Sequence, residues 1–168
     1  MNIIKNLKNK IFSKETIISL LIIISIFIAD RVSKINIINK QVNNDSLFIN
    51  NYLNFDLIWN TGIGFGFFSH NANIYYHLIS FLIFLVIVFL IYLIIRASLF
   101  DKIFYSMVLG GAVGNFYDRL FYFAVPDFID IHINEFHWFT FNIADIFISI
   151  GIIFLIISDL ILNKEWKL

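Results

Sequence analysis

The chain has 168 residues, of which 60% are hydrophobic, and its mean hydropathy is +0.83. Soluble domains are roughly 45–50% apolar, so water is not the main solvent of this protein. Its 12 basic and 12 acidic side chains cancel, which gives no electrostatic basis for binding nucleic acid, and the lack of cysteine excludes disulfides, thiolate nucleophiles and cysteine-ligated metals.

Apolar stretches long enough to cross a bilayer, which takes about 20 residues, organise the chain. The first candidate follows a Lys-rich leader, as a signal peptide does, but no small-x-small cleavage site follows its apolar core, so a retained first span is expected at 16–38. Further spans are expected at 75–95, 103–125 and 139–162. The sequence therefore predicts a single membrane domain, residues 1–168, with four transmembrane helices.

Basic residues indicate the direction of these spans. Eight of the 12 Lys and Arg residues lie in the N-terminal arm, the 96–102 turn and the C-terminal tail. Cytoplasmic segments are enriched in such residues, so both termini are expected in the cytoplasm and residues 39–74 and 124–138 outside. Apolar and polar residues alternate from Leu53 to Asn60, as in a half-buried strand. The expected fold class is an all-α polytopic membrane protein with a small extracytoplasmic β-sheet within 39–74.

Polar side chains inside the spans gather at one predicted depth, toward the outer face. Such residues are costly in a bilayer and are functional candidates by default. They are Asp30 and Lys34 in the first span, Asn115, Asp118 and Arg119 in the third, and Asn142 and Asp145 in the fourth.

Spacings of three or four residues place side chains on one helix face. They pair Asp30 with Lys34, Asn115 with Arg119, and Asn142 with Asp145.

Gly110 and Gly114 precede the polar cluster of the third span, and their Gly-x-x-x-Gly spacing predicts the close approach of another helix.

Asp145 has no basic residue within four positions and requires a partner from another element. Asp127 lies at matching depth, and two adjacent carboxylates would share a proton, which provides one general base and one general acid. Other interpretations stay open: Asp127, next to Pro126, suits a turn. Arg119 suits a structural ion pair with Asp118 or Asp30, and the two intramembrane asparagines suit interhelical hydrogen bonds.

Metal-dependent and cofactor-dependent chemistry is not expected. The four histidines show no His-Glu-x-x-His spacing and lie mostly near span edges, where interfacial roles are common. No metal ligand and no cofactor is therefore predicted.

Five segments in order resemble those of bacterial lipoprotein signal peptidases, the signal peptidase II family. They cover about residues 30–151 and are Asp30–Lys34, Asn60–Phe65, Gly110–Arg119, Val125–Asp130 and Phe141–Asp145. The sequence departs from the family at Phe123, a common glycine position, and at Pro126, a common valine position.

The resemblance implies an aspartic endopeptidase that removes the signal peptide from diacylglyceryl-modified prolipoproteins at the outer face of the bacterial inner membrane. It implies that Asp127 and Asp145 are catalytic. It places six residues around the substrate, namely Asn60, Gly62, Asn115, Arg119, Asn142 and Ala144, and two in a supporting pair, Asp30 and Lys34. The expected partners are lipid-modified prolipoproteins and membrane lipids, with the enzyme acting as a monomer.

Two other functions are compatible with intramembrane carboxylates. A small proton-coupled transporter would need a relay that continues to both faces, and the inner halves of the last three spans lack ionisable residues until their ends. A non-catalytic membrane assembly factor would tolerate Asp145→Asn.

Overall fold

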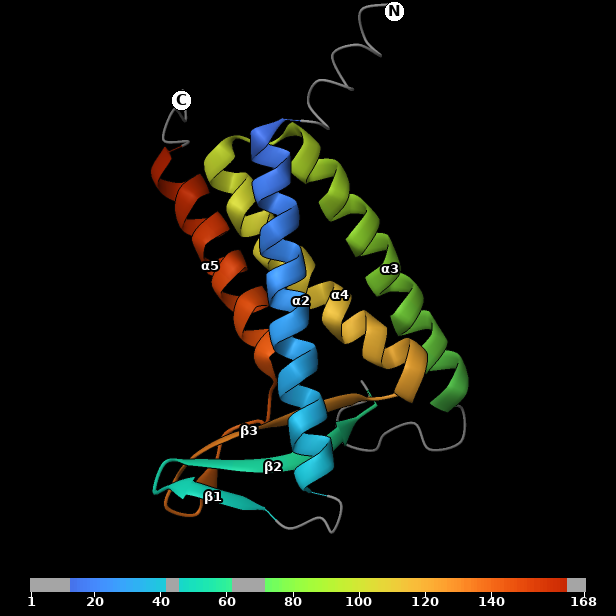
Figure 1. The fold of residues 1–168 in the computed structure, drawn as a ribbon, viewed down its shortest axis with the longest axis vertical. Coiled ribbons are helices and arrows are strands. Elements are labelled where there is room, and N and C mark those ends of the chain that lie inside the picture. Colours follow the sequence, from blue (N-terminus) through green and yellow to red (C-terminus); the bar gives the residue numbers. More distant parts are fainter. Residues whose placement is uncertain (1–12, 42–45, 62–71, 163–168) are drawn as a thin grey trace, which may run out of the picture.

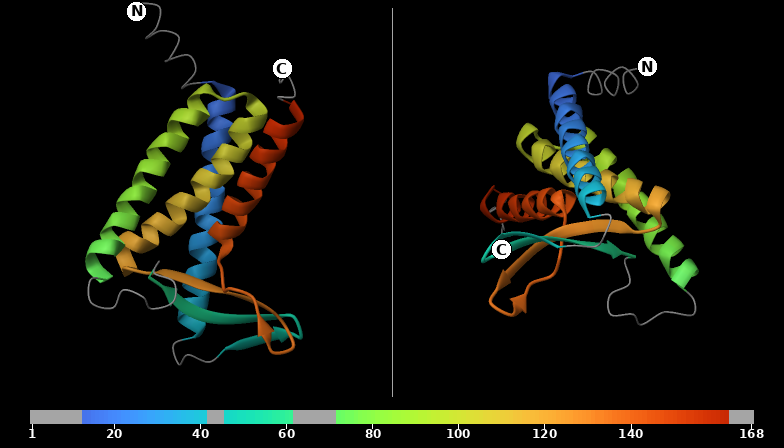
Figure 2. Two further views of the ribbon diagram at one scale, coloured as in Figure 1. Left: turned by 180° about the vertical axis from the view of Figure 1, so that it is seen from behind. Right: turned by 60° about the horizontal axis from the view of Figure 1, so that its bottom comes forward.

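The computed structural model describes residues 13–41, 46–61 and 72–162. Four long helices lie side by side and a small sheet covers one end of them (Figures 1 and 2). The helices are α2 (Lys14–Lys40), α3 (Ala72–Arg96), α4 (Leu99–Tyr122) and α5 (Ile143–Leu162). The mostly helical fold with a small sheet is confirmed.

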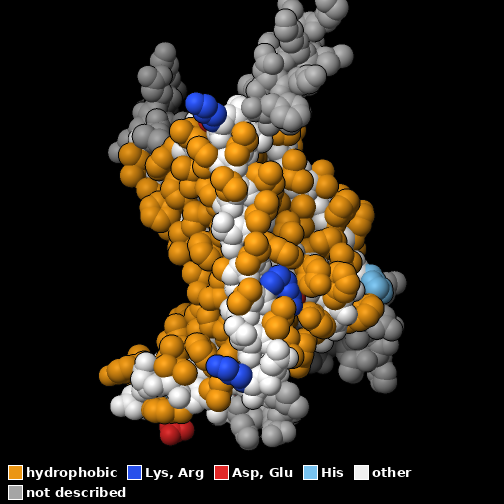
Figure 3. Space-filling model, in the orientation of Figure 1, with side chains coloured by type: hydrophobic (Ala, Val, Ile, Leu, Met, Phe, Trp, Pro, Cys, Tyr) orange, Lys and Arg blue, Asp and Glu red, His pale blue; other side chains and the backbone are white. Residues whose placement is uncertain are grey.

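Three of these helices, α2, α3 and α5, are long and apolar enough to cross a membrane. At 1.5 Å per residue, their 27, 25 and 20 residues give lengths of about 30–40 Å, close to the thickness of a hydrocarbon core. Hydrophobic side chains cover most of the helical part of the face in Figure 3. Water would not solvate such a surface, so we assign it to the lipid phase.

Helix α4 has 24 residues and packs against α2, α3 and α5. Its glycines permit the predicted close approach. A Cβ at Gly110 would lie 3.0 Å from the Ile26 Cβ of α2, and one at Gly111 would lie 2.5 Å from the Ala144 carbonyl oxygen of α5. The absence of side chains here brings the polar parts of three helices together.

The sheet contains β1 (Leu47–Asn50), β2 (Leu53–Asn60), β3 (Val125–Ile133) and β4 (Phe136–His137), in that order and antiparallel throughout. Strand β2 confirms the strand expected from Leu53 to Asn60, and its burial falls along the strand from half-buried to exposed instead of alternating. Its register with β3 shifts between Phe55 and Ile58, and Ile58 pairs with Asp127. A bulge of this kind re-aims side chains locally, and it lies beside the residue predicted to be catalytic.

The ends of two predicted spans differ from the observed helices. The span expected over 103–125 stops at Tyr122, and the 124–138 connection forms β3 and β4, which join the sheet expected within 39–74. The span expected over 139–162 begins at Ile143, because Phe141 forms a bridge to Ile129 of β3. Hydropathy does not distinguish buried strand from helix, which explains both differences.

Phe123 ends α4 in the left-handed conformation, with φ 55°. A residue with a Cβ loses roughly 1–2 kcal/mol of stability in this conformation, and glycine does not. We therefore expect Phe123→Gly to be more stable than Phe123→Ala by about 1 kcal/mol, measured by thermal unfolding in detergent. Equal stabilities would show that this backbone conformation is not maintained.

Candidate active site

Asp127 lies on β3, beside the ends of the helices, and is 4% exposed. Its Oδ1 accepts a hydrogen bond from the Asn142 amide at 2.5 Å and its Oδ2 accepts one from the Asn60 amide at 2.8 Å. Both carboxyl oxygens are thus held by asparagines from separate elements, which fixes the orientation of the group.

Asp145 occupies the first turn of α5 and is half-buried. Its Oδ2 accepts from the Asn142 backbone N–H at 3.1 Å, while the Asp145 N–H donates to the Asn142 side-chain oxygen at 3.1 Å. This reciprocal arrangement is a capping box, which starts the helix and positions the carboxylate. The helix N-terminus also favours negative charge at this place.

Asn142 connects the two aspartates. Its side-chain amide binds Asp127, and its backbone N–H binds Asp145. The predicted pairing of Asn142 with Asp145 is present, and Asn142 is fully buried. One residue therefore holds both carboxyl groups at the junction of β3 and α5.

The pKa of Asp127 is raised above the ordinary value of an aspartate. Burial is the main cause, and the negative charge of Asp145 acts in the same direction, against the hydrogen bonds from Asn60 and Asn142. Asp127 therefore favours the protonated state more than a solvent-exposed carboxyl group does.

A buried lysine supports the site from α2. The Lys34 Nζ donates to Asp30 at 2.7 Å, to Asp118 at 2.7 Å and to the Asn115 side-chain oxygen at 2.9 Å. The bond from Lys34 leaves the Asn115 amide nitrogen directed at Asp145, whose Oδ1 it reaches at 2.8 Å. Lys34 thus orients a hydrogen-bond donor to Asp145 without contacting it.

Asp30 joins α2 to the start of α5. Its Oδ1 accepts from the Ala144 backbone N–H at 3.0 Å, one of the N–H groups that a helix cannot satisfy internally. Asp30, Lys34 and Ala144 are fully buried. The predicted pairing of Asp30 with Lys34 is present, and it anchors the helix that carries Asp145.

Arg119 does not form the ion pair proposed for it. Asp118 instead forms ion pairs with Lys34 and Arg31. The Arg119 Nη1 donates to the Asn115 carbonyl oxygen at 3.1 Å, and its buried Nε has no hydrogen-bond partner. The charges of Asp127 and Asp145 reach this guanidinium, so it belongs to the same electrostatic environment. Gly62 lies outside the described residues.

Sequence reasoning missed the role of Asp118 and Arg31. Asp118 lies three residues after Asn115 and so on the same face of α4, which was the available signal. Arg31 also stacks over the Tyr117 ring at 4.8 Å. The ion pair of Arg31 with Asp118 neutralises part of the buried charge beside Lys34.

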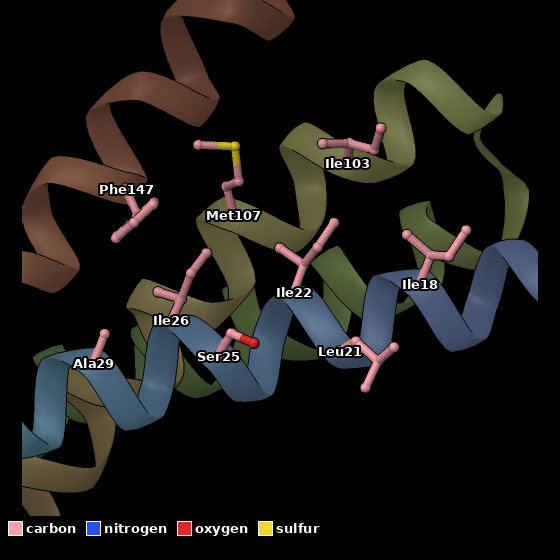
Figure 4. A pocket seen from close by; sticks show the side chains of 9 residues that line it. All are labelled: Ile18, Leu21, Ile22, Ser25, Ile26, Ala29, Ile103, Met107 and Phe147. Carbon is pink, nitrogen blue, oxygen red and sulfur yellow. The ribbon is translucent and has the colours of Figure 1, made fainter.

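Two hollows differ in chemistry. One, of about 550 Å³ between α2, α4 and α5, has apolar walls and a single hydroxyl, that of Ser25, so it offers no acid or base (Figure 4). Another, of about 270 Å³, is bordered by Asp145, by the Ser149 hydroxyl and by apolar side chains of α5 and the segment before it, among them Phe141 and Ile146. The second hollow gives an apolar group access to Asp145.

Comparison with known proteins shows the family of the chain. A family model described as Signal peptidase (SPase) II matches residues 22–161. The chain belongs to the signal peptidase II family. It is therefore an enzyme of the bacterial inner membrane, an aspartic peptidase that removes signal peptides from prolipoproteins.

Relatives and solved structures cover most of the chain. A lipoprotein signal peptidase of Pelagibacter ubique (strain HTCC1062) is 44% identical over 94% of this chain and 96% of its own length. One of Francisella tularensis subsp. mediasiatica (strain FSC147) is 40% identical over 71% of this chain and 77% of its own. A solved structure described as a bacterial membrane enzyme is 32% identical, with a TM-score of 0.73 over 88% of this chain and 93% of its own.

Proposed function

We propose that Asp127 and Asp145 are the catalytic pair of this signal peptidase II. The observation that carries the proposal is that Asn142 binds both carboxyl groups, one through its side chain and one through its backbone. Polar groups from α2, α4 and β2 complete the surroundings of the pair. A purely structural role in an ion pair would require a cationic side chain bound to the two carboxylates. Among the described residues, no charged group donates a hydrogen bond to Asp127 or Asp145.

The two carboxyl groups have different roles. Asp145, at a helix N-terminus where negative charge is favoured, acts as the base: it removes a proton from water, and the oxygen of that water attacks the scissile carbonyl carbon. Asp127, whose pKa is raised by burial, donates its proton to the carbonyl oxygen. Collapse of the tetrahedral intermediate breaks the C–N bond. The proton held by Asp145 passes to the leaving amine, and one hydroxyl proton of the intermediate returns to Asp127, which leaves a carboxylic acid and restores both aspartates.

Asn60, Asn115, Arg119 and Asn142 surround this chemistry. Asn115 and Asn142 hold Asp145, and Asn60 and Asn142 hold Asp127. Arg119 is half-buried, and its Nε is free of hydrogen bonds within the described residues, so its guanidinium has donor capacity left for a carbonyl oxygen of the substrate. We include Gly62 with them on the resemblance alone.

The substrate is a prolipoprotein whose cysteine carries diacylglyceryl. The apolar hollow beside Asp145 suits a hydrocarbon group at the cleavage point. Purified enzyme in detergent should release the signal peptide from the modified prolipoprotein and act far more slowly on the same protein without the lipid. Equal rates on both would contradict the lipid requirement, and no release from either would contradict the function.

All four helices cross the membrane, and both termini are cytoplasmic. Helix α2 begins and α5 ends at the end of the bundle opposite the sheet, which places the described chain ends together (Figure 1). By sequence, eight of the 12 Lys and Arg residues fall in the N-terminal arm, the 96–102 turn and the C-terminal tail, which favours the cytoplasmic side for these segments. The sheet and the catalytic pair then belong to the outer face. One copy of the chain supplies both carboxylates, so we expect a monomer to act.

The chain lacks cysteine, so single cysteines can report this topology. Asn51→Cys, in the exposed turn between β1 and β2, should react with an impermeant thiol reagent in cells with a permeable outer barrier. Ala97→Cys, between α3 and α4, should react only after lysis. The reverse pattern would show that the protein has the opposite orientation.

A further inference from the structure

The hairpin of β3 and β4 brings together three side chains that bind metals in proteins. The Asp130 Oδ2 lies 2.8 Å from the His137 Nδ1 and 3.7 Å from the His132 Nδ1. His132 and His137 are direct partners across the two strands, and their rings stack with centroids 5.0 Å apart. One ligand atom from each residue lies within 4.8 Å of the others.

His132 provides an independent sign of a ligand. Its side chain is 10% exposed, and its Nδ1 is buried without a hydrogen-bond partner. That nitrogen faces the Asp130 carboxylate at a distance too long for a hydrogen bond. Buried polar atoms are normally satisfied, so an unpartnered nitrogen beside a carboxylate calls for a cation or another missing group.

We propose that Asp130, His132 and His137 bind a divalent transition metal ion, with zinc as the best match. Two imidazoles and one carboxylate, with a fourth position for water, form a common zinc ligand set. Ca²⁺ and Mg²⁺ prefer oxygen ligands and are disfavoured. Zinc bonds of about 2.0–2.2 Å place tetrahedral ligand atoms roughly 3.3 Å apart. The His137 side chain is 52% exposed and free to move by the small distance required.

The site is structural and lies apart from the catalytic pair. Asp130 follows Asp127 by three positions on one strand, so the two side chains point to opposite faces of the sheet. A metal ion would join the two-residue strand β4 to β3 and so stiffen the strand that carries Asp127. The sequence predicted no metal ligand because it lacked a local zinc motif, whereas these ligands meet only through strand pairing.

Zinc binding is measurable on untagged, full-length protein in detergent after treatment with a chelator. We expect one bound Zn²⁺ per chain by calorimetry and elemental analysis, with a higher Tm in Zn²⁺ than in Mg²⁺. His132→Ala and His137→Ala should each weaken binding by at least roughly 100-fold. His77→Ala, which removes an exposed histidine of α3, is the matched control and should bind normally.

A measurement on the wild type avoids dependence on the folding of the variants. Bound Cu²⁺ should show electron paramagnetic resonance couplings to two imidazole nitrogens. No stoichiometric Zn²⁺ binding, coupling to fewer than two nitrogens, or equal loss in His77→Ala would overturn the proposal. Signal-peptide cleavage itself should need no metal. Chelator should therefore lower the Tm while cleavage persists at moderate temperature. Failure of the metal site and failure of the proposed function are thus seen in separate measurements.

Discussion

Replacing Asp127 or Asp145 with asparagine should each lower kcat/KM for signal-peptide cleavage by about 10³-fold or more, because a positioned acid or base contributes roughly 10²–10⁴-fold. Asparagine keeps the size of the side chain but can neither remove a proton from water nor return one. Membrane insertion should persist, as checked by protease protection. Cleavage rates on equal amounts of inserted protein provide the measurement.

Asp56→Asn is the matched control for these substitutions. Asp56 lies half-buried on β2 and, unlike Asn60 of the same strand, forms no hydrogen bond with the pair, so its variant should retain most activity. Asp118 and Asp130 are unsuitable controls because both are buried. Asp118 forms ion pairs with Lys34 and Arg31, and Asp130 contacts His137. An equal loss of activity in Asp56→Asn would show that the loss comes from removing any negative charge, and not from the catalytic pair.

The pH profile of the wild type should be bell-shaped, because cleavage needs one ionised and one protonated carboxyl group. Activity should rise with pH as the base loses its proton and fall as the acid loses its own. The raised pKa of Asp127, caused mainly by burial, places the falling limb above the ordinary range of aspartates. The two apparent pKa values belong to the pair.

Lys34→Met should destabilise the protein by about 3–5 kcal/mol, because removing one partner of a buried ion pair leaves uncompensated charge. Lys34 and its partners Asp30 and Asp118 are fully buried. Cleavage should also fall, since Asn115 would lose the bond that directs its amide at Asp145. Thermal unfolding in detergent and the cleavage rate of the folded fraction measure the two effects.

Lys40→Met is the matched control, because Lys40 lies in the last turn of the same helix with its side chain exposed. Its stability should change by less than about 0.5 kcal/mol. A folded Lys34→Met protein with wild-type stability would mean that the buried network does not hold α2, α4 and α5 together.

The sequence predicted the helices and the polar cluster because both depend on local patterns. Hydropathy located the apolar helices, and spacing within a helix paired Asp30 with Lys34 and Asn142 with Asp145. Period-two alternation predicted β2.

The remaining features depend on contacts between distant segments. Val125–Ile133 was expected within an extracytoplasmic connection in which Pro126 favours a turn, so its strand was missed. Asp118 was considered as an ion-pair partner of Arg119, yet it forms ion pairs with Arg31 and Lys34 of another helix. The meeting of Asp130, His132 and His137 likewise requires the register of β3 with β4. Helix packing and strand register decide such partners, and neither is encoded in spacing along the chain.

The cleavage rate of the Asp127→Asn/Asp145→Asn double variant, compared with each single variant on diacylglyceryl-modified prolipoprotein, tests the catalytic pair most directly. Residues that act as one unit are strongly non-additive. We predict that the double variant is scarcely slower than either single variant, with all three inserted in equal amounts. Losses that multiply, or substantial turnover by either single variant, would contradict an aspartate pair acting on one water molecule.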